Sequence, residues 1–306
     1  MRPADLLRLI ALAAIWGASF LFVRVAVPSL GAAWLTELRV ALGAVAMVLY
    51  ALVSGLRFEP RRHWRHYLVM GALNTALPWA LYAYSGNYIG ASTMAILNAA
   101  TPWFAAVCGA IWLGERFSAR KASGLVLGLV GVALVVGLGP IETNANAVLA
   151  SLACVAATAC YALCGTYMKR RAAGVSPLVM SAGSLVVASV VVLPGLPGPL
   201  PVQALLAWPV AIAVLGISLL CSALAYVLYF RLIVNVGPTK SLTVTFLIPV
   251  FGVLWGAAFL GEPIGASTLI GGGVILLSTA LVLGIGPGGR ARYNSLLSKR
   301  DKSQLP

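Results

Sequence analysis

Apolar runs, each long enough to cross a membrane, follow one another along almost the whole chain. A helix needs roughly 20 apolar residues to cross about 30 Å of hydrocarbon. Clusters rich in Gly, Pro or Asn separate several of the runs, as at 139–146 and 194–201. We therefore predict an all-α polytopic membrane protein with ten transmembrane helices, at about residues 6–27, 32–53, 66–85, 89–113, 119–138, 146–168, 176–194, 204–230, 238–260 and 264–286.

The composition excludes a soluble protein. Hydrophobic residues make up 61% of the chain and charged residues only 9%, whereas a soluble domain carries about 25% charged residues. A net charge of +14 could indicate a nucleic-acid partner. The basic residues lie instead in short clusters between apolar runs, which is typical of signals that set membrane orientation. The lipid bilayer is thus the expected partner, and no nucleic acid is expected.

The basic clusters predict the orientation of the chain. With the N-terminus in the cytoplasm and ten spans, all but two of the 21 Lys and Arg residues face the cytoplasm; the exceptions are Arg24 and Arg39. The opposite topology would place almost all of them outside, against the positive-inside rule. Both termini are therefore predicted to be cytoplasmic.

An internal repeat relates the two halves of the chain. When the two halves are aligned with one constant offset, Pro102 matches Pro249. The same offset matches the Leu-Gly-Glu triplet that ends at Glu115 with the one that ends at Glu262. A weaker match pairs Trp16 and Arg24 with Tyr161 and Lys169. We predict a first five-helix repeat at 1–140, a second at 146–287 and a basic cytoplasmic tail at 288–306.

Because each repeat holds an odd number of spans, the second is expected to enter the membrane upside down. The charges agree: the cluster after Glu115 is basic, but its counterparts after Glu262 are uncharged (Arg116, Arg120 and Lys121 against Pro263, Ser267 and Thr268). Each copy thus carries the charges that suit its own orientation. Inverted repeats are a common plan of secondary transporters, because two similar halves can exchange roles and open one site to either side.

The chain resembles the drug/metabolite transporter superfamily, as a ten-helix member with two EamA-type repeats. The stretch "IWGASFLFVR" near the start, the two blocks Pro102–Glu115 and Pro249–Glu262 and the glycine-rich helices after them carry the resemblance. It is similar to the bacterial YddG-type exporters of aromatic amino acids. The resemblance implies a basket-shaped bundle in which helices 3, 4, 8 and 9 line a central cavity, with helices 5 and 10 at the back.

The same four helices carry matched polar and aromatic stripes when residues are projected at the helical period. Uncharged polar groups in hydrocarbon tend to face protein or a wet cavity. Ordinary packing, in which Ser and Thr bond their own helix, is the alternative for any single residue. The predicted substrate-binding residues are Asn74, Thr75, Pro78, Trp79, Tyr82, Met94, Asn98, Ser218, Ser222, Tyr226, Tyr229, Ser241 and Thr245.

These stripes contain no charged residue near their centre, which predicts a neutral or zwitterionic solute with aromatic or apolar bulk. Pro102 and Pro249 fall within predicted helices, where each removes a backbone hydrogen bond; they are candidate gating residues, with a static kink as the alternative. Glu115 and Glu262 are expected to cap loops or to begin the next helix. For Glu37 we expect a structural ion pair with Arg39 or Arg24.

The sequence therefore predicts a secondary transporter of the bacterial inner membrane that exports amino acids, aromatic or large neutral ones, or similar metabolites, by alternating access. The alternatives are a transporter of the same fold for another solute, such as a nucleotide sugar or a drug, and a channel. No enzyme is expected, since no catalytic or metal-ligand pattern lies at membrane depth, and no cofactor or metal is expected. We expect a monomer, with a dimer as the alternative.

Overall fold

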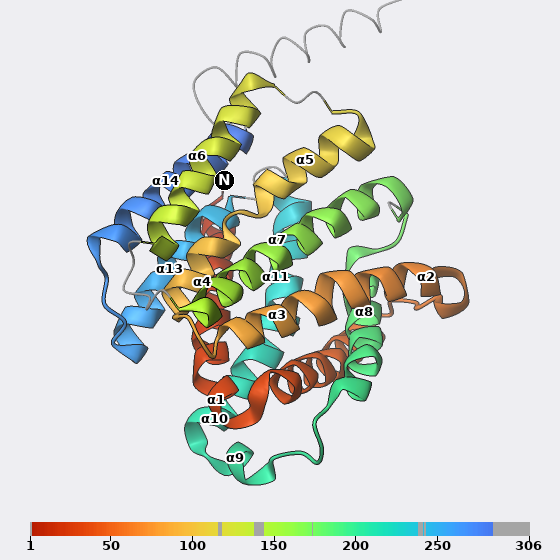
Figure 1. Cartoon of the computed structure of the whole chain (residues 1–306). Helices are drawn as coiled ribbons and strands as arrows, with labels where there is room; N and C mark the ends of the chain where they lie inside the picture. The colour runs from red at the N-terminus through yellow and green to blue at the C-terminus, as the bar shows by residue number, and fades with distance from the viewer. Residues whose placement is uncertain are drawn as a thin grey trace, which may run out of the picture.

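The computed structural model describes residues 2–115, 118–137, 144–172, 174–237, 241 and 243–283. Within these residues the chain forms helices joined by short turns and contains no strand (Figure 1). Large apolar side chains are exposed on most helices; Val53, Leu206 and Val234 each expose more than three-quarters of their surface. An apolar exterior of this extent suits lipid rather than water, so the fold is that of a multi-pass membrane protein.

Each predicted span falls on helical structure where it is described. Five helical stretches are long and apolar enough to cross a membrane on their own: Pro3–Val53, Ala91–Leu113, Ala145–Arg171, Pro177–Gly195 and Trp208–Val236. Val244–Leu260 and Ala266–Val282 are shorter and also apolar. The exact number of crossings stays a prediction.

The first two predicted spans form one helical stretch with a sharp kink, α1 (Pro3–Val53). The kink lies at Gly31, whose φ of 74° and ψ of 161° are not helical. A positive φ favours glycine, which has no Cβ to clash with the backbone. The chain can therefore turn at Gly31, and the two arms of α1 pack against the helices of both halves.

The third and eighth predicted spans share a local departure from α-helical geometry. The third consists of α2 (Pro60–Met70), the π-helical η1 (Gly71–Ala76) and α3 (Leu77–Ser85). The eighth contains the π-helical η3 (Gly216–Leu224) between α10 (Trp208–Leu215) and α11 (Ala225–Val236). The two π-helical segments overlap when the repeats are aligned. Such segments are rare and occur often at functional sites.

The fourth and ninth predicted spans differ from each other. The fourth is interrupted between α4 (Ala91–Asn98) and α5 (Thr101–Leu113), whereas α13 (Val244–Leu260) is a single helix. The sixth and seventh predicted spans correspond to α7 (Ala145–Arg171) and α8 (Pro177–Val192). After α8 come the short turn η2 (Leu193–Gly195) and α9 (Val202–Leu206).

Two glycine-rich helices, α6 (Ala119–Gly137) and α14 (Ala266–Leu283), lie side by side at one edge of the bundle (Figure 1). Their glycines allow the two helices to approach closely. A Cβ on Gly124 would lie 2.8 Å from Val282, and one on Gly271 would lie 2.6 Å from Val135. The Ser278 hydroxyl also donates a 2.5 Å hydrogen bond to the carbonyl of Gly124.

Candidate transport cavity

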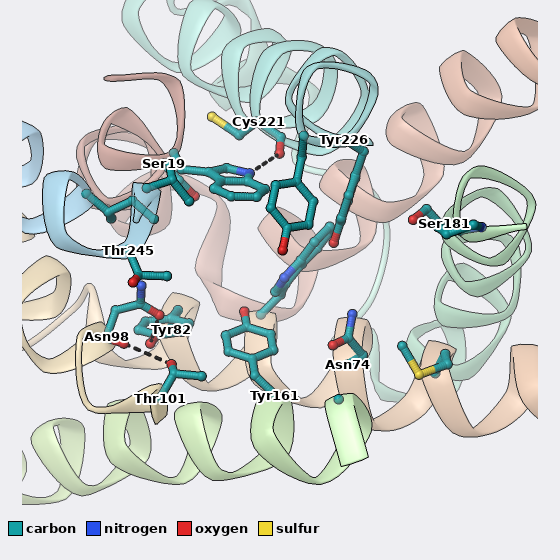
Figure 2. A pocket seen from close by; sticks show the side chains of 18 of the residues that line it. Ser19, Asn74, Tyr82, Asn98, Thr101, Tyr161, Ser181, Cys221, Tyr226 and Thr245 are labelled. Atoms are coloured by element: carbon teal, nitrogen blue, oxygen red, sulfur yellow. Dashed lines mark hydrogen bonds between the residues drawn. The ribbon is translucent and has the colours of Figure 1, made fainter. Parts of the chain in front are cut away.

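A cavity of about 490 Å³ lies among α1, α3, α7, α8, α11 and α13, with further contributions from the π-helical segments and the turn between α4 and α5. Its wall is mostly apolar and aromatic, with a few polar groups. Figure 2 shows Tyr161 and Tyr226 projecting into it from opposite sides, with Asn74 and Ser181 toward one end and Asn98 and Thr245 toward the other.

Seven of the thirteen predicted substrate-binding residues line this cavity: Asn74, Trp79, Tyr82, Asn98, Tyr226, Tyr229 and Thr245. They come from both halves of the chain and from each of the four predicted helices. The structure therefore brings together half of the predicted set, while their role in binding stays a prediction.

The other six predicted residues do not line the cavity; they are Thr75, Pro78, Met94, Ser218, Ser222 and Ser241, and all are buried in helix packing. Ser218 donates to the Leu38 carbonyl (3.3 Å), and Ser241 to the Gly237 carbonyl (2.8 Å). For these residues the ordinary packing alternative describes their position better. The π-helical geometry of η1 and η3 explains part of the difference, because an extra residue per turn changes the direction of Thr75, Ser218 and Ser222 relative to an α-helix.

A hydrogen bond and ring contacts fix the aromatic residues of one wall. The Tyr82 hydroxyl donates to Asn98 Oδ1 at 2.9 Å, which joins α3 to the end of α4. The Tyr82 ring meets Phe20 edge-on at 5.4 Å between centroids and stacks on Tyr161 at 6.5 Å. Rings packed in this way keep their orientation, so the wall presents rigid aromatic faces to a ligand.

The opposite wall is built around Trp16. Its indole Nε1–H donates to the carbonyl of Cys221 in η3 at 3.2 Å (Figure 2). Its ring lies 6.4 Å from Tyr226 and 5.3 Å from Tyr229, centroid to centroid. The first arm of α1 is thereby tied to the aromatic residues of α11.

Lining residues also come from α1, α7 and α8, which the projected stripes did not include. Trp16, Ser19, Phe20 and Val23 line the cavity and belong to the "IWGASFLFVR" stretch that carried the family resemblance. Tyr161 on α7 also lines it. The weak repeat match between Trp16 and Tyr161 was the signal that could have indicated both.

The prediction of an uncharged cavity is wrong, because Arg39 lines it. Arg39 is only 7% exposed, and its Nε–H donates to the Ser222 hydroxyl at 3.1 Å. Its guanidinium carbon lies 3.5 Å from the centroid of the Trp79 ring, a cation–π arrangement. Arg39 was not among the predicted lining residues because it belongs to α1, which is not one of the four helices whose residues were projected.

The predicted ion pair of Glu37 is also wrong. Glu37 Oε1 accepts a 2.6 Å hydrogen bond from the Ser189 hydroxyl of α8, and its buried Oε2 has no hydrogen-bond partner among the described residues. Arg24, the other expected partner, donates to the Gly86 carbonyl at 2.7 Å. Packing of α1 against α8 and α3 thus separates the charges that are neighbours in the sequence.

Glu262 caps a helix of the other half of the chain. Its carboxylate accepts the backbone N–H groups of Ala91 (2.6 Å) and Ser92 (2.9 Å) and the Ser92 hydroxyl (2.5 Å). Capping was expected, but of its own loop or the next helix rather than α4. Its repeat counterpart Glu115 instead lies near two lysines, Lys121 at 3.6 Å and Lys169 at 3.8 Å.

The two candidate gating prolines occupy different local structures. Pro249 lies inside α13, as predicted, where it removes a helical hydrogen bond. Pro102 lies in the first turn of α5, just after the interruption. A first-turn N–H has no helical partner in any case, so the expectation that Pro102 breaks a mid-helix bond is wrong.

An apolar helical bundle whose two halves enclose a partly polar cavity is typical of a membrane transporter. The chain belongs to the EamA-like transporter family, whose model matches it twice, at residues 4–137 and 148–284. Together with the apolar helices, this identifies a multi-pass transporter of the inner membrane.

Several curated proteins are similar to this chain. An uncharacterized transporter of Bacillus subtilis, YvbV, is 29% identical over 80% of this chain and 80% of its own length. A probable terminal-alkyne amino-acid exporter of Streptantibioticus cattleyicolor is 23% identical over 87% and 89%. The uncharacterized inner membrane transporter YedA of Escherichia coli is 23% identical over 90% and 89%.

A solved crystal structure shares the fold. It superposes with a TM-score of 0.58 at 18% sequence identity and covers 92% of this chain and 96% of that one. At this identity the likeness extends to the arrangement of the helices and no further.

Proposed function

We propose that this protein exports aromatic or large neutral amino acids, or closely similar metabolites, across the inner membrane. The observation that carries the proposal is the cavity, whose walls combine Trp16, Trp79, Tyr82 and Tyr161 with the amide of Asn98. Its volume of about 490 Å³ falls within the range of roughly 300–1,000 Å³ typical of small-molecule sites. The Streptantibioticus relative is named a probable terminal-alkyne amino-acid exporter, which supports amino acids as the substrate class.

The mechanism we propose is alternating access by two inverted five-helix repeats, with ten crossings and both termini in the cytoplasm. The cavity wall extends to Gly165 and Pro177, both exposed, at the end of the bundle that the basic residues predict to be cytoplasmic. At the predicted outer end, Glu262 joins the second half of the chain to α4. These positions support a state in which the site is reached from the cytoplasm.

Transport of a nucleotide sugar is the second candidate, and Arg39 favours it more than the sequence suggested. A basic residue in the cavity was the feature expected to be missing. Yet one guanidinium among aromatic and apolar groups suits a single negative charge better than a diphosphate, which commonly engages several cations. The amino-acid proposal therefore accounts for more of the lining.

Proteoliposomes would test the proposal. Purified protein reconstituted into vesicles should take up labelled phenylalanine, tryptophan, leucine, aspartate, lysine and a nucleotide sugar at different rates, measured with and without a pH gradient. We expect saturable uptake of the aromatic and large neutral amino acids above protein-free vesicles, and little uptake of the others. Uptake of the nucleotide sugar alone would replace the proposal with its alternative.

A further inference from the structure

Arg39 is a buried cation in the wall of a cavity. The side chain leaves the second arm of α1 and lies over the Trp79 ring, 3.5 Å from guanidinium carbon to ring centroid. Its Nε–H bonds the Ser222 hydroxyl at 3.1 Å. That hydroxyl donates in turn to the Ile217 carbonyl in η3 at 2.9 Å, so the guanidinium is held in one orientation from two sides.

The described acids are all engaged elsewhere. Asp5 lies 2.6 Å from Arg8, and Glu59 lies 3.2 Å from Arg62. Glu115 lies near Lys121 and Lys169, Glu262 caps α4, and Glu37 accepts from Ser189. In the part of the chain that the structure describes, Arg39 therefore has no carboxylate partner.

Part of the guanidinium is unused. Arginine has five N–H donors in a fixed planar fork. The Nε–H bonds Ser222, whereas the Nη groups of Arg39 make no hydrogen bond with any described residue. Because Arg39 lines the cavity, the donors that remain are available to a bound molecule.

The Trp79 ring and the free N–H donors of Arg39 determine which chemical group can bind. A guanidinium stays protonated in proteins, and a buried cation without a counter-ion is unfavourable. The Trp79 face and Ser222 offset part of this cost. A small planar oxyanion matches the geometry that remains, because a carboxylate accepts two parallel N–H bonds from one guanidinium.

We propose that Arg39, supported on Trp79 and oriented by Ser222, is the subsite that binds the carboxylate of the transported solute. This inference rests on the proposed function, since it names the group through which an amino acid would be recognised. The side chain of the solute then lies against Tyr82, Tyr161 and Tyr226, which line the same cavity. A solute without a carboxylate leaves the cation unpaired and is rejected.

The test compares ligands that differ only at the charged groups. Purified protein in detergent is titrated with L-phenylalanine, its carboxamide L-phenylalaninamide, 3-phenylpropionate and 3-phenylpropanamide, and binding is measured by calorimetry. The wild type should prefer each acid over its amide by at least about tenfold, the scale of a charge-assisted bidentate contact. Because 3-phenylpropionate has no amino group, its pair isolates the carboxylate.

Variants then assign the preference to one residue. In Arg39→Gln the ratio of acid to amide binding should fall to near one, and in Arg39→Lys, which keeps a point charge but loses the fork, it should fall less. Arg24→Gln is the matched control, because Arg24 bonds the Gly86 carbonyl and does not line this cavity; it should keep the wild-type ratio. The ratio is measured within one folded sample, so a lower yield of a variant does not change it.

The binding ratios and the uptake measurements together separate the subsite from the proposed function. Equal wild-type binding of acids and amides, absence of binding of either acid, or an unchanged ratio in Arg39→Gln would overturn the subsite. Uptake of amino acids by vesicles together with an unchanged ratio in Arg39→Gln would leave the proposed function standing without it. The protein could instead transport no amino acid and still prefer 3-phenylpropionate over its amide, with that preference lost in Arg39→Gln. This result would retain the subsite and overturn the amino-acid function.

Discussion

Glu262 and Ser92, which lie in opposite halves of the chain, are joined by two hydrogen bonds: Glu262 Oε2 accepts the backbone N–H of Ser92 at 2.9 Å and its hydroxyl at 2.5 Å. Ser92 is the second residue of α4, whose first N–H groups have no partner within the helix. A carboxylate at this position satisfies them and interacts favourably with the helix dipole. The contact therefore holds the start of α4 against the end of α13.

If this contact closes the outer end of the cavity, Glu262→Ala should open it. Loss of a helix cap costs about 1–2 kcal/mol, which corresponds to a shift of roughly 5- to 30-fold between two states. In a chain with Asn98→Cys and the native cysteines replaced, an impermeant thiol reagent added outside should label position 98 faster. Glu115→Ala, at the equivalent position of the first repeat, is the control and should not raise external labelling. Unchanged labelling in Glu262→Ala would remove the gating role.

The topology can be read from two loops that the structure describes. Gly174 lies between α7 and α8, beside a basic cluster, and Gly198 lies between α8 and α9. The positive-inside rule places the first loop in the cytoplasm and the second outside. A reporter inserted at Gly174 should be active only in its cytoplasmic form, and one at Gly198 only in its external form. The reverse pattern would contradict the inverted-repeat account.

Trp79 should determine selectivity for aromatic solutes. It forms part of the cavity wall and also supports Arg39. Trp79→Ala should reduce the uptake of aromatic amino acids by about tenfold, the equivalent of about 1.4 kcal/mol of lost contact. Trp208→Ala is a matched control, because Trp208 is 75% exposed and does not line the cavity. Equal uptake by both variants would place Trp79 outside the substrate path.

Substitution of Pro102 and of Pro249 should have unequal effects on the side from which the cavity is open. Pro249→Ala restores a hydrogen bond inside α13, whereas Pro102→Ala adds an N–H in the first turn of α5, where no helical partner exists. We expect Pro249→Ala to change the side from which Asn98→Cys is labelled, and Pro102→Ala to change it less or in the opposite direction. Labelling that is unchanged in Pro249→Ala would make that proline a static kink.

Close packing at the edge of the bundle predicts a stability difference between two glycines. A Cβ on Gly128 would clash with the Trp103 ring, whereas a Cβ on Gly273 would meet nothing within 4 Å. Gly128→Ala should therefore destabilise the protein by about 1–3 kcal/mol, the usual cost of overpacking. Gly273→Ala should leave stability unchanged or slightly raised. Thermal unfolding in detergent measures both, and equal unfolding temperatures would contradict the packing described.

Helical periodicity predicted much of this fold, and seven of the thirteen residues that it placed in the cavity line it. Trp79, Tyr82 and Asn98 were found because apolar and polar residues alternate at the spacing of a helix, and that spacing is local. These features depend on residues close together in the chain.

Features that depend on packing between distant segments could not be predicted in this way. Arg39 follows Glu37 by two residues, so a local ion pair was expected; its actual neighbours, Trp79 and Ser222, are brought to it by the arrangement of three helices. An α-helical projection places Ser222 on the lining face, whereas the residue lies in the π-helical segment η3. The partner of Glu262 lies 170 residues away along the chain, and nothing local indicates it.

Counterflow distinguishes a carrier with alternating access from a channel. Proteoliposomes loaded with unlabelled phenylalanine are diluted into a trace of labelled phenylalanine, and the label inside is followed with time. A carrier whose single cavity alternates between the two sides should give a transient accumulation above the equilibrium level, which Trp79→Ala should reduce and Trp208→Ala should not. A simple approach to equilibrium, with no accumulation and no saturation, is the behaviour of a channel and would contradict the account.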